Sequence, residues 1–455
     1  MNMKLDAFER DIKQKKVTVI GIGISNLPLI KYLNRLGAEV TACDKRSADS
    51  LGKSYDELNA LGVNMRLGED YLSQIDGDVI FKTPGMRYDI PELNAARERG
   101  AEVTSEMEVF FDICPCKIIA VTGSDGKTTT TTLINKMMEQ EGYKTWLGGN
   151  IGNPLLTEVS KMQESDYVIL ELSSFQLHTL KKSPHIAVMT NISPNHLDMH
   201  KDYQEYIDAK KNIMLYQTSD DILVTNSGNE ITKEIGEDAK GENRDFSSQS
   251  DALIHLKDNY IYYGDEAILK TEDIKIPGKH NVENYMAAIG AVHDLVSKQS
   301  INAVARSFGG VEHRIELVRE LDGVKYYNSS IDSSPNRTKN TLSVFPEKVI
   351  MISGGKDKGI PYDEIGPVIV DRVKVLVLIG ATAGAIEAAV KKALKDAEAD
   401  IKIFHADTYP EAVLTAKENA HPGDVVLLSP ASTSFDMFKN FEERGNLYKE
   451  IVNSL

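Results

Sequence analysis

The sequence predicts an α/β protein of three domains, in which helices cover parallel sheets. With 455 residues, the chain is long enough for about three domains of ordinary size. Along its whole length, short apolar runs alternate with helix-like segments, which is typical of parallel strands joined by crossover helices. We place the domains at residues 1–110, 111–310 and 311–455.

Each domain repeats this alternation of strand and helix. In the first, the predicted strands are Val17–Ile20, Glu39–Cys43 and Asp78–Phe81. In the second, they are Tyr167–Leu172, Ile186–Asn191 and Ile222–Asn226. In the third, they are Val349–Ser353, Val373–Ile379, Ile401–Phe404 and Val425–Leu428. A helix is predicted over Ala383–Lys395, and the polar stretch Glu237–Asp251 is predicted to form surface loops.

The composition favours a cytoplasmic enzyme with small-molecule substrates. The 68 acidic residues exceed the 52 basic ones, and a net charge of −16 disfavours nucleic acid or an anionic membrane as a partner. The start of the chain is charged and has no apolar core of a signal peptide, and no apolar run approaches the ~20 residues of a membrane span. The three cysteines lack the spacing of a structural zinc site.

A phosphate-binding loop is predicted at the start of the second domain. The apolar strand Ile118–Val121 runs into a glycine-rich loop and a helix. Backbone N–H groups of such a loop face phosphate oxygens, the lysine reaches the β- and γ-phosphates, and the next hydroxyl binds Mg²⁺. Val121 stands where the generic loop has its first glycine, which points to a subclass. The predicted ATP-binding residues are Gly123, Ser124, Asp125, Gly126, Lys127, Thr128 and Thr129.

A second glycine-rich turn follows the first predicted strand. Gly21 and Gly23 allow close approach of a pyrophosphate, and Asp44, at the end of the next strand, can accept hydrogen bonds from a ribose or a base. Asn26 replaces the third glycine of the dinucleotide fingerprint, which weakens the case for a nicotinamide cofactor. A UDP-linked substrate fits as well as NAD, and a tight turn without a ligand stays possible.

Polar residues gather where strands of the second domain end. Glu171 ends one predicted strand, and His196 follows the next. Ligands of open α/β sheets bind at the carboxyl edge of the strands, so we expect both residues near Lys127. A carboxylate there is a candidate Mg²⁺ ligand.

Taken together, these residues resemble the ATP-dependent muramyl ligases, the Mur ligase family, and within it the members that use D-glutamate. The resemblance covers nearly the whole chain and depends on the order of its motifs. Besides the phosphate loop, these are Asn150–Gly152, Glu171–Leu177, Asn191–Asp198, Gly278–Asn284, His313–Glu316, Gly354–Gly359 and Ser429–Asp436.

The resemblance implies an ATP-dependent ligase that adds D-glutamate to UDP-N-acetylmuramoyl-L-alanine through an acyl phosphate. ADP and phosphate would be released, and the product would serve peptidoglycan synthesis, cell wall biogenesis, cell shape and cell division. It implies a Rossmann-like N-terminal domain for the UDP substrate, a central P-loop ATPase-like domain with a parallel sheet, and a Rossmann-like C-terminal domain for the amino acid. The implied UDP-substrate contacts are Gly23, Ile24, Ser25, Asp44, Gly85 and Asn150. Asn281, Asn284 and Arg314 are implied around ATP, and Ser333, Lys358, Ser434 and Phe441 around D-glutamate.

The resemblance also implies two Mg²⁺ ions, held by Thr128, Glu171, His196 and Lys210. Lys210 matches a lysine that the family carries as a carbamate, and a carbamate supplies the anionic oxygen that Mg²⁺ prefers, whereas two cations repel an ammonium. The implied catalytic residues are Lys127, His196 and Lys210, with His196 acting in metal support or in proton transfer. We expect a monomer.

The chain departs from the family pattern at three positions. Ser329 and Ile331 stand where many members have an aspartate and a lysine, and Asn195 replaces an aspartate before His196. Asp332 is a candidate replacement for the missing acidic ribose contact. Three alternatives remain open: a folylpolyglutamate synthetase, which lacks the Gly21–Asp44 module; a nicotinamide-dependent dehydrogenase; and a nucleotide-sensing module without chemistry.

Overall fold

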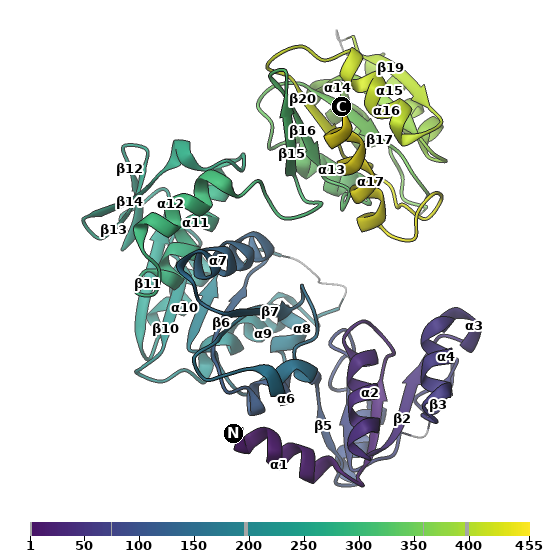
Figure 1. Ribbon diagram of the computed structural model, residues 1–455, viewed down its shortest axis with the longest axis vertical. Helices are drawn as coiled ribbons and strands as arrows, with labels where there is room; N and C mark the ends of the chain where they lie inside the picture. The colour runs from purple at the N-terminus through teal and green to yellow at the C-terminus, as the bar shows by residue number, and fades with distance from the viewer. Residues whose placement is uncertain (1, 74, 195–198, 358, 396–399) are drawn as a thin grey trace. The chain divides into compact units, whose positions relative to one another are not determined.

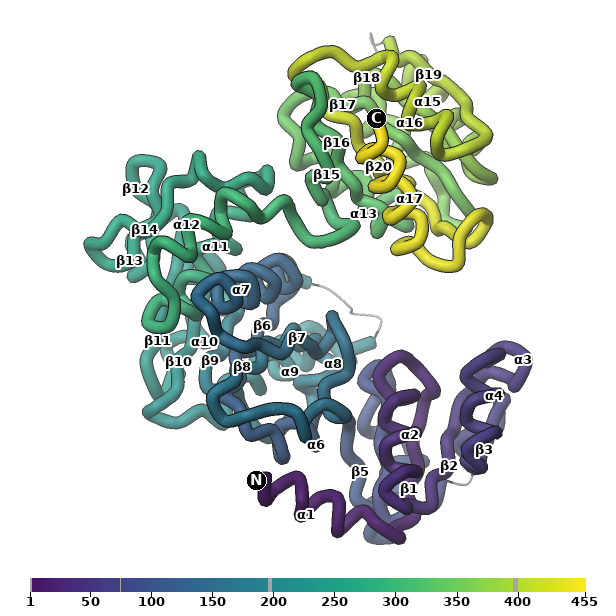
Figure 2. The backbone as a smooth tube through the Cα atoms, viewed as in Figure 1, coloured from purple at the N-terminus to yellow at the C-terminus, as the bar shows by residue number. Residues whose placement is uncertain are grey.

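A computed structural model describes residues 2–73, 75–194, 199–357, 359–395 and 400–455. It contains three sheets, each flanked by helices (Figure 1), and the backbone path through them is traced in Figure 2. Contacts divide the chain into two compact units: residues up to 271 with 282–304, and residues 272–281 with 305–455. The prediction of an α/β protein with three parallel-rich sheets is confirmed, whereas the boundaries at residues 110 and 310 stay predictions.

The N-terminal sheet has five parallel strands in the order β3-β2-β1-β4-β5. Its central strand is nearly all buried, because helices cover both faces of a parallel sheet. The strands are β1 Lys16–Ile20, β2 Glu39–Asp44, β3 Asn64–Leu67, β4 Val79–Phe81 and β5 Glu102–Thr104. The helices are α1 Met3–Ile12, α2 Asn26–Leu36, α3 Ala48–Leu51, α4 Lys53–Ala60, α5 Pro91–Glu98 and α6 Glu106–Ile113.

The second sheet has nine strands in the order β14-β13-β12-β11-β10-β9-β6-β8-β7. From β12 to β7 neighbouring strands pair in parallel, and β12, β13 and β14 form an antiparallel meander. The strands are β6 Lys117–Thr122, β7 Thr145–Gly149, β8 Tyr167–Glu171, β9 Ile186–Met189, β10 Ile222–Asn226, β11 Glu242–Ser247, β12 Ile254–Lys257, β13 Tyr260–Tyr263 and β14 Glu266–Lys270. The helices are α7 Lys127–Glu141, α8 Ser174–Leu177, α9 Tyr203–Leu215, α10 Glu230–Glu237, α11 Lys279–Val292 and α12 Lys298–Ser307, with 3₁₀ turns at Leu156–Lys161 and Thr271–Asp273.

The prediction of surface loops over Glu237–Asp251 is wrong, because β11 lies inside that stretch and pairs in parallel with β10. The strand is polar by composition, yet Arg244 is buried and forms ion pairs with Glu242 and Asp294. The prediction relied on apolar residues to identify buried strands, and here the buried residue is a paired arginine.

The C-terminal sheet has six strands in the order β15-β16-β20-β17-β18-β19, of which the pair β15 and β16 is antiparallel and the other pairs are parallel. The strands are β15 Glu316–Leu321, β16 Val324–Asn328, β17 Val349–Ser353, β18 Val373–Ile379, β19 Lys402–Ala406 and β20 Val425–Leu428. The helices are α13 Pro335–Leu342, α14 Ile365–Arg372, α15 Ala383–Leu394, α16 Tyr409–Glu418 and α17 Phe441–Ser454.

Hydrophobic packing joins the first two sheets into one unit. A single cluster of buried apolar side chains runs from β1 and α2 through α6 to β6, β8 and α9. The C-terminal sheet has its own clusters on its two faces. In the described part of the chain, no helix has the length and apolar character needed to cross a membrane.

Candidate active site

The order of the central strands brings the predicted ATP-site residues to one edge. Strand β6 lies between β8 and β9, so the phosphate loop after β6 has Glu171 on one side and Thr190 and Asn191 on the other. This is the carboxyl edge of the parallel strands, where open α/β sheets bind ligands. Helix α9 adds Lys210 to the same edge, next to the loop.

Two glycines allow the phosphate loop to pack against its neighbours. Gly123 has φ +153°, and a Cβ there would lie 1.9 Å from Thr190 Oγ1. Gly126 has φ +79°, and a Cβ there would lie 2.3 Å from Asn284 Oδ1. Both backbone conformations and both close approaches exclude a larger residue.

Side chains from other elements hold the loop in place. The Asn191 side chain accepts from Asp125 N at 3.0 Å, and Thr190 Oγ1 donates to Asp125 O at 2.6 Å. The hydroxyls of Ser124 and Tyr206 lie 2.9 Å apart. The loop is therefore fixed by side chains before any nucleotide binds, which limits the entropy that binding must remove.

Lys127 begins helix α7 and turns back over the loop. Its ammonium donates to Gly123 O and to Ser124 O, each at 2.9 Å. Thr128 and Thr129 follow in the first turn of α7 and are half-buried. A helix N-terminus with a lysine in front of it attracts phosphate, and the ammonium can exchange carbonyl oxygens for phosphate oxygens.

Glu171, at the end of β8, presents one uncompensated carboxylate oxygen. The side chain is 2% exposed, and Oε1 accepts from Asn150 Nδ2 at 2.7 Å. Among the described residues, Oε2 has no hydrogen-bond partner although it is buried. A buried carboxylate without a partner is costly, and a cation would compensate it.

Lys210 on α9 is buried beside the same loop. Its side chain is 2% exposed, and Nζ donates to Gly123 O at 2.7 Å and lies 4.8 Å from the centre of the Tyr206 ring. Burial lowers the pKa of the Lys210 ammonium well below its usual value, and Lys127 lowers it further, while Glu171 and Asp125 oppose the shift. Burial therefore favours the neutral form of this amine more than it does at a surface lysine.

The oxygen donors of this site are suited to Mg²⁺ bound together with a nucleotide, and less suited to a metal that only protein side chains would hold. No group of three or more His, Cys, Asp or Glu side chains that could hold a metal is found in the part of the chain that the structure describes. Glu171 Oε2 and the Thr128 hydroxyl are hard oxygen donors, and Mg²⁺ typically combines one or two carboxylates with phosphate oxygens of the substrate. Two predicted site residues, His196 and Lys358, lie outside the described residues.

The glycine-rich turn of the N-terminal sheet has a different electrostatic arrangement. Asp44 is 5% exposed, and it accepts from Ile22 N at 2.8 Å and from Arg46 NH2 at 2.7 Å. Burial alone would raise the pKa of Asp44, but hydrogen bonds from Arg46 and Ile22 N outweigh it and lower the pKa to about 2. Asn26, in place of the third glycine, donates to Ile20 O at 3.0 Å and supports the turn from beneath.

The predicted UDP-substrate residues fall in two places. Gly23, Ile24, Ser25, Asp44 and Gly85 lie at the carboxyl edge of the N-terminal sheet, because β2, β1 and β4 are neighbours there. Ile24 is 86% exposed, although it is large and apolar. Asn150 is on the central sheet instead, where its side chain and backbone both contact Glu171.

In the C-terminal unit, a buried arginine organises the predicted amino-acid site. Ser333 and Ser434 lie in two loops at the carboxyl edge of the sheet, and Phe441 begins α17. Arg444 is fully buried; Nε and NH2 donate to Ser330, and NH1 donates to Ser432 O at 3.1 Å. One guanidinium thus links both loops.

The segment after β16 contains one departure from the family pattern, Ser329, and the candidate replacement for the acidic ribose contact, Asp332. Asp332 is 4% exposed and accepts from Ser429 Oγ at 2.7 Å, and burial raises the pKa of its carboxyl. Ser329 is fully buried. The contact with Ser429 links Asp332 to the end of β20, so this carboxylate helps to hold the two strand ends together.

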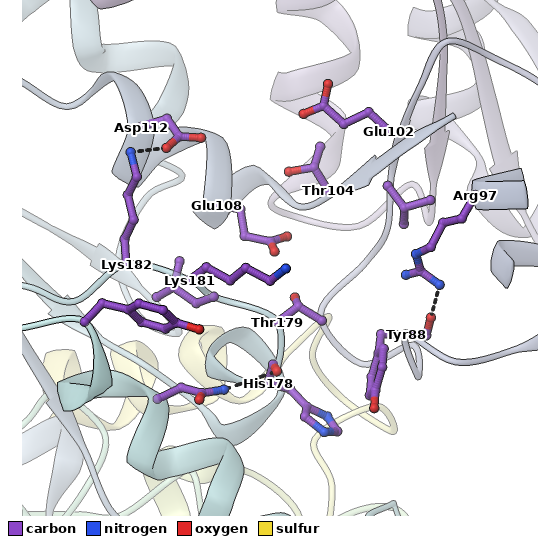
Figure 3. Close-up of a pocket in the computed structure, with 14 residues that line it drawn as sticks. Tyr88, Arg97, Glu102, Thr104, Glu108, Asp112, His178, Thr179, Lys181 and Lys182 are labelled. Carbon is purple, nitrogen blue, oxygen red and sulfur yellow. Dashed lines mark hydrogen bonds and ion pairs between the residues drawn. The ribbon is translucent and has the colours of Figure 1, made fainter. Parts of the chain in front are cut away.

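A cavity of about 720 Å³ lies apart from all of these residues (Figure 3). An ion pair between Lys182 and Asp112 crosses one end of it, and Arg97 donates to Tyr88 O at the other. None of the predicted site residues that the structure describes lines it. Its size alone does not make it the nucleotide site.

Three residues of these sites were not predicted from the sequence: Arg46, Tyr206 and Arg444. A basic residue two positions after Asp44 was a usable signal for Arg46, and the helical i, i+4 spacing from Lys210 was one for Tyr206. Arg444 gave no local signal, because its partners are contributed by loops distant in the sequence.

Known protein families match all three parts of the chain. The Mur ligase MurD-like N-terminal domain matches residues 15–105, the Mur ligase middle domain residues 121–292, and the Mur ligase glutamate ligase domain residues 313–432. A UDP-N-acetylmuramoylalanine--D-glutamate ligase of Ruminiclostridium cellulolyticum is 57% identical over 468 residues, which cover 100% of both chains. The ligases of the same name from Acetivibrio thermocellus and Clostridium perfringens are 56% and 49% identical, again over 100% of both chains.

Solved structures share the fold at lower identity. The UDP-N-acetylmuramate-alanine ligase MurC of Thermotoga maritima has a TM-score of 0.58 and 19% identity, covering 97% of this chain and 99% of that one. MurF of Acinetobacter baumannii has a TM-score of 0.58 and 16% identity, covering 98% and 92%. With domain matches in each third of the sequence and full-length relatives of more than half identity, the chain belongs to the Mur ligase family.

Proposed function

We propose that the protein is an ATP-dependent ligase that joins D-glutamate to UDP-N-acetylmuramoyl-L-alanine in peptidoglycan synthesis. The observation that carries this is the 57% identity over the full length of the UDP-N-acetylmuramoylalanine--D-glutamate ligase of Ruminiclostridium cellulolyticum. The MurD-like match over residues 15–105 separates the chain from folylpolyglutamate synthetases, which lack that module. Lys127, Glu171 and Lys210 on one edge of the central sheet favour chemistry over nucleotide sensing alone.

The reaction proceeds in two steps, phosphoryl transfer and then amide formation. An oxygen of the L-alanyl carboxylate attacks the γ-phosphorus of ATP, the bond to the bridging oxygen breaks, and ADP leaves with an acyl phosphate in place. The neutral amine of D-glutamate then attacks the acyl carbon, phosphate leaves, and the amine proton is lost. ATP is required because an amide does not form spontaneously from a carboxylate in water.

The phosphate loop positions and neutralises the transferred group. Backbone N–H groups between Gly123 and Lys127 and the N-terminus of α7 bind phosphate oxygens. Lys127 exchanges its contacts with Gly123 O and Ser124 O for the β- and γ-phosphates, where charge develops during transfer. Ser124, Asp125 and Thr129 complete the loop, with Asn281, Asn284 and Arg314 proposed around the rest of the nucleotide.

We propose Glu171 and Thr128 as ligands of one Mg²⁺ ion, and Lys210 with His196, which lies outside the described residues, for a second. Bound Mg²⁺ supplies charge neutralisation to the phosphoryl group. Glu171 Oε2 is buried and has no hydrogen-bond partner in the part of the chain that the structure describes, so it is an anionic oxygen available to a cation.

We propose that Lys210 is carbamylated. The neutral amine adds to the carbon of CO₂ and loses a proton, which leaves a carbamate anion. Burial among Gly123, Tyr206 and the loop favours the neutral amine that this reaction needs, and conversion to an anion removes the repulsion between two lysines and a metal. His196 would act beside it, in metal support or in proton transfer.

The outer domains bind the two other substrates. Gly23, Ile24, Ser25, Asp44 and Gly85 are proposed to contact the uridine diphosphate, with Asn150 acting from the central sheet. Ser333, Lys358, Ser434 and Phe441 are proposed to receive D-glutamate. A monomeric cytoplasmic enzyme is the form that we expect, since its substrates are soluble nucleotides and an amino acid.

Phosphate release tests this function. The protein should release phosphate from ATP with UDP-N-acetylmuramoyl-L-alanine and D-glutamate, and should do so far less with L-glutamate, D-alanine or meso-diaminopimelate. Omission of the UDP substrate is the matched blank for ATP hydrolysis. Turnover with another amino acid in place of D-glutamate would move the protein to another branch of the family, and a change in nicotinamide absorbance would support a dehydrogenase.

A further inference from the structure

We propose that Arg87 and Glu205 couple the two nucleotide sites, so that binding at the N-terminal turn strengthens binding at the phosphate loop. Arg87 follows Gly85 by two positions, and Glu205 lies in the first turn of α9, the helix that carries Lys210. The inference rests on the proposed function, because it assumes that a UDP-linked substrate binds near Gly85 and ATP near Lys127.

Every N–H group of the Arg87 guanidinium donates a hydrogen bond. NH1 and NH2 each donate at 3.0 Å to a different oxygen of Glu205, which forms a bidentate pair. Nε and NH2 donate to the two oxygens of Asp89 at 2.8 and 2.9 Å, and NH1 also donates to Met199 O at 3.1 Å. All five N–H groups of the arginine therefore have acceptors, and only a planar fork can meet this geometry.

Glu205 ties this fork to the start of α9. Its Oε2 accepts from Lys201 N at 2.7 Å, so the same carboxylate holds the segment that leads into the helix. His178 Nε2 and His200 Nδ1 lie 3.8 and 3.6 Å from its oxygens. The side chain is 14% exposed, which reduces screening of the pair by solvent.

Two residues of helix α9 contact the phosphate loop directly. Tyr206, next to Glu205, places its hydroxyl 2.9 Å from Ser124 Oγ, and Lys210 donates to Gly123 O at 2.7 Å. A shift of α9 would therefore displace two contacts of the loop that we assign to ATP. Helices transmit such shifts because their backbone is rigid.

The other end of the path is the turn after β4. A Cβ on Gly21 would lie 3.1 Å from Thr83 Cβ, so the two turns of the N-terminal site pack directly on each other. Tyr88, which follows Arg87, packs edge to face on His178 with 4.7 Å between ring centres, and both line the cavity in Figure 3. A ligand that shifts the turn at Gly85 would thereby shift Arg87 and, through Glu205, the start of α9.

Calorimetric titration measures the coupling directly. The probe is the β,γ-imido analogue of ATP with Mg²⁺, titrated with and without saturating UDP-N-acetylmuramoyl-L-alanine and without D-glutamate. We expect the UDP substrate to tighten binding of the analogue about tenfold, within the usual range of coupling between sites. The reverse titration must give the same factor, because coupling of binding equilibria is reciprocal.

Substitutions then assign the coupling to the fork. Arg87→Met should reduce the factor to near one, while each ligand alone binds within about threefold of wild type. Glu205→Gln should do the same, and the double variant should lose no more than either single variant, since both remove one interaction. Arg87→Lys should recover only part of the factor, because an ammonium cannot form the bidentate pair. Arg66→Met, which removes a surface pair with Asp76, is the matched control and should keep the full factor.

The possible results separate this inference from the proposed function. A wild-type protein that fails to bind the UDP substrate contradicts the function and the inference together. A wild-type protein that binds both ligands without coupling contradicts the inference alone, as does an Arg87→Met or Glu205→Gln variant that melts like wild type and keeps the full factor. Loss of the factor in both single variants and its retention in Arg66→Met support the fork.

Discussion

The two glycine-rich turns of this chain each follow a buried parallel strand, but the charged groups beside them are paired differently. In the N-terminal turn, Asp44 is already paired with Arg46 and Ile22 N. Beside the central loop, Glu171 keeps a buried oxygen without a hydrogen-bond partner among the described residues, and the Lys127 ammonium donates to two carbonyl oxygens of the loop. The first turn is compensated within the protein, whereas the second has charge that a ligand can use.

This difference shows why glycine spacing does not by itself identify a ligand. Glycines provide access for a phosphate in both turns, but the groups at the neighbouring strand ends decide which chemistry follows. A compensated turn can bind a substrate that stays intact. A turn with an uncompensated carboxylate and two lysines suits a nucleotide that is cleaved with a cation bound.

Removal of the lysine from the uncompensated turn should have the largest effect. Lys127→Ala should lower the rate of ADP release about 1000-fold, the loss expected when a group that stabilises transition-state charge is removed. Lys136→Ala, on the exposed face of the same helix and paired with Glu139, is the control and should retain normal turnover. Near-normal turnover of the Lys127 variant, measured with unchanged melting, would falsify the assignment of this loop to ATP.

Removal of the buried lysine on α9 should have the second largest effect. Lys210→Ala should lose about 100-fold in turnover, because the anionic ligand that we propose for the second cation disappears. Addition of short carboxylic acids such as acetate should restore part of the activity by placing a carboxylate in the space left. Lys211→Ala, which affects only a surface pair with Asp238, should be unaffected. If no acid restores activity, the carbamate is contradicted.

A change of charge at Glu171 sharpens the comparison. Glu171→Gln keeps an acceptor for Asn150 Nδ2 but removes the negative charge, so the Mg²⁺ concentration needed for half-maximal turnover should rise about 10- to 100-fold. The measurement is a Mg²⁺ titration of phosphate release at saturating ATP. Glu158→Gln, in an exposed pair with Lys161, should leave the titration unchanged. An unchanged midpoint for Glu171→Gln would remove this carboxylate from the metal site.

Most of the fold was predictable because its strands are continuous apolar runs. Ile222–Asn226, Val349–Ser353, Val373–Ile379 and Val425–Leu428 begin and end where predicted. Such strands are buried on both faces, so their sequences have little ambiguity. β11 was missed because Arg244 is buried as an ion pair and breaks the apolar pattern.

The residues of the candidate site were predictable where they lie at or shortly after the end of a strand. Lys127, Thr128 and Glu171 follow strands directly, so the topology of a parallel sheet places them on one edge. The contacts that hold this edge were not predictable: Tyr206 on Ser124 and Arg87 on Glu205 join segments more than 80 residues apart. Such contacts depend on how whole helices and strands pack, and the local sequence pattern does not show that packing.

The smallest effect should come from the compensated turn. Because the pKa of Asp44 falls from 3.8 to about 2 on folding, the ionised carboxylate stabilises the native state above pH 4, and this contribution is lost as pH falls from about 4 to 2. The shift corresponds to about 2 kcal/mol, which screening around the half-exposed Arg46 reduces to about 1 kcal/mol. Asp44→Asn should therefore lower the free energy of unfolding by about 1 kcal/mol at pH 7 and by about half as much at pH 3, as measured by urea unfolding. Asp70→Asn, at an exposed position of the same domain, should show no such pH-dependent difference. An equal loss at pH 7 and pH 3 would mean that Asp44 acts through shape and not through charge, and the two turns would then no longer differ in the way proposed.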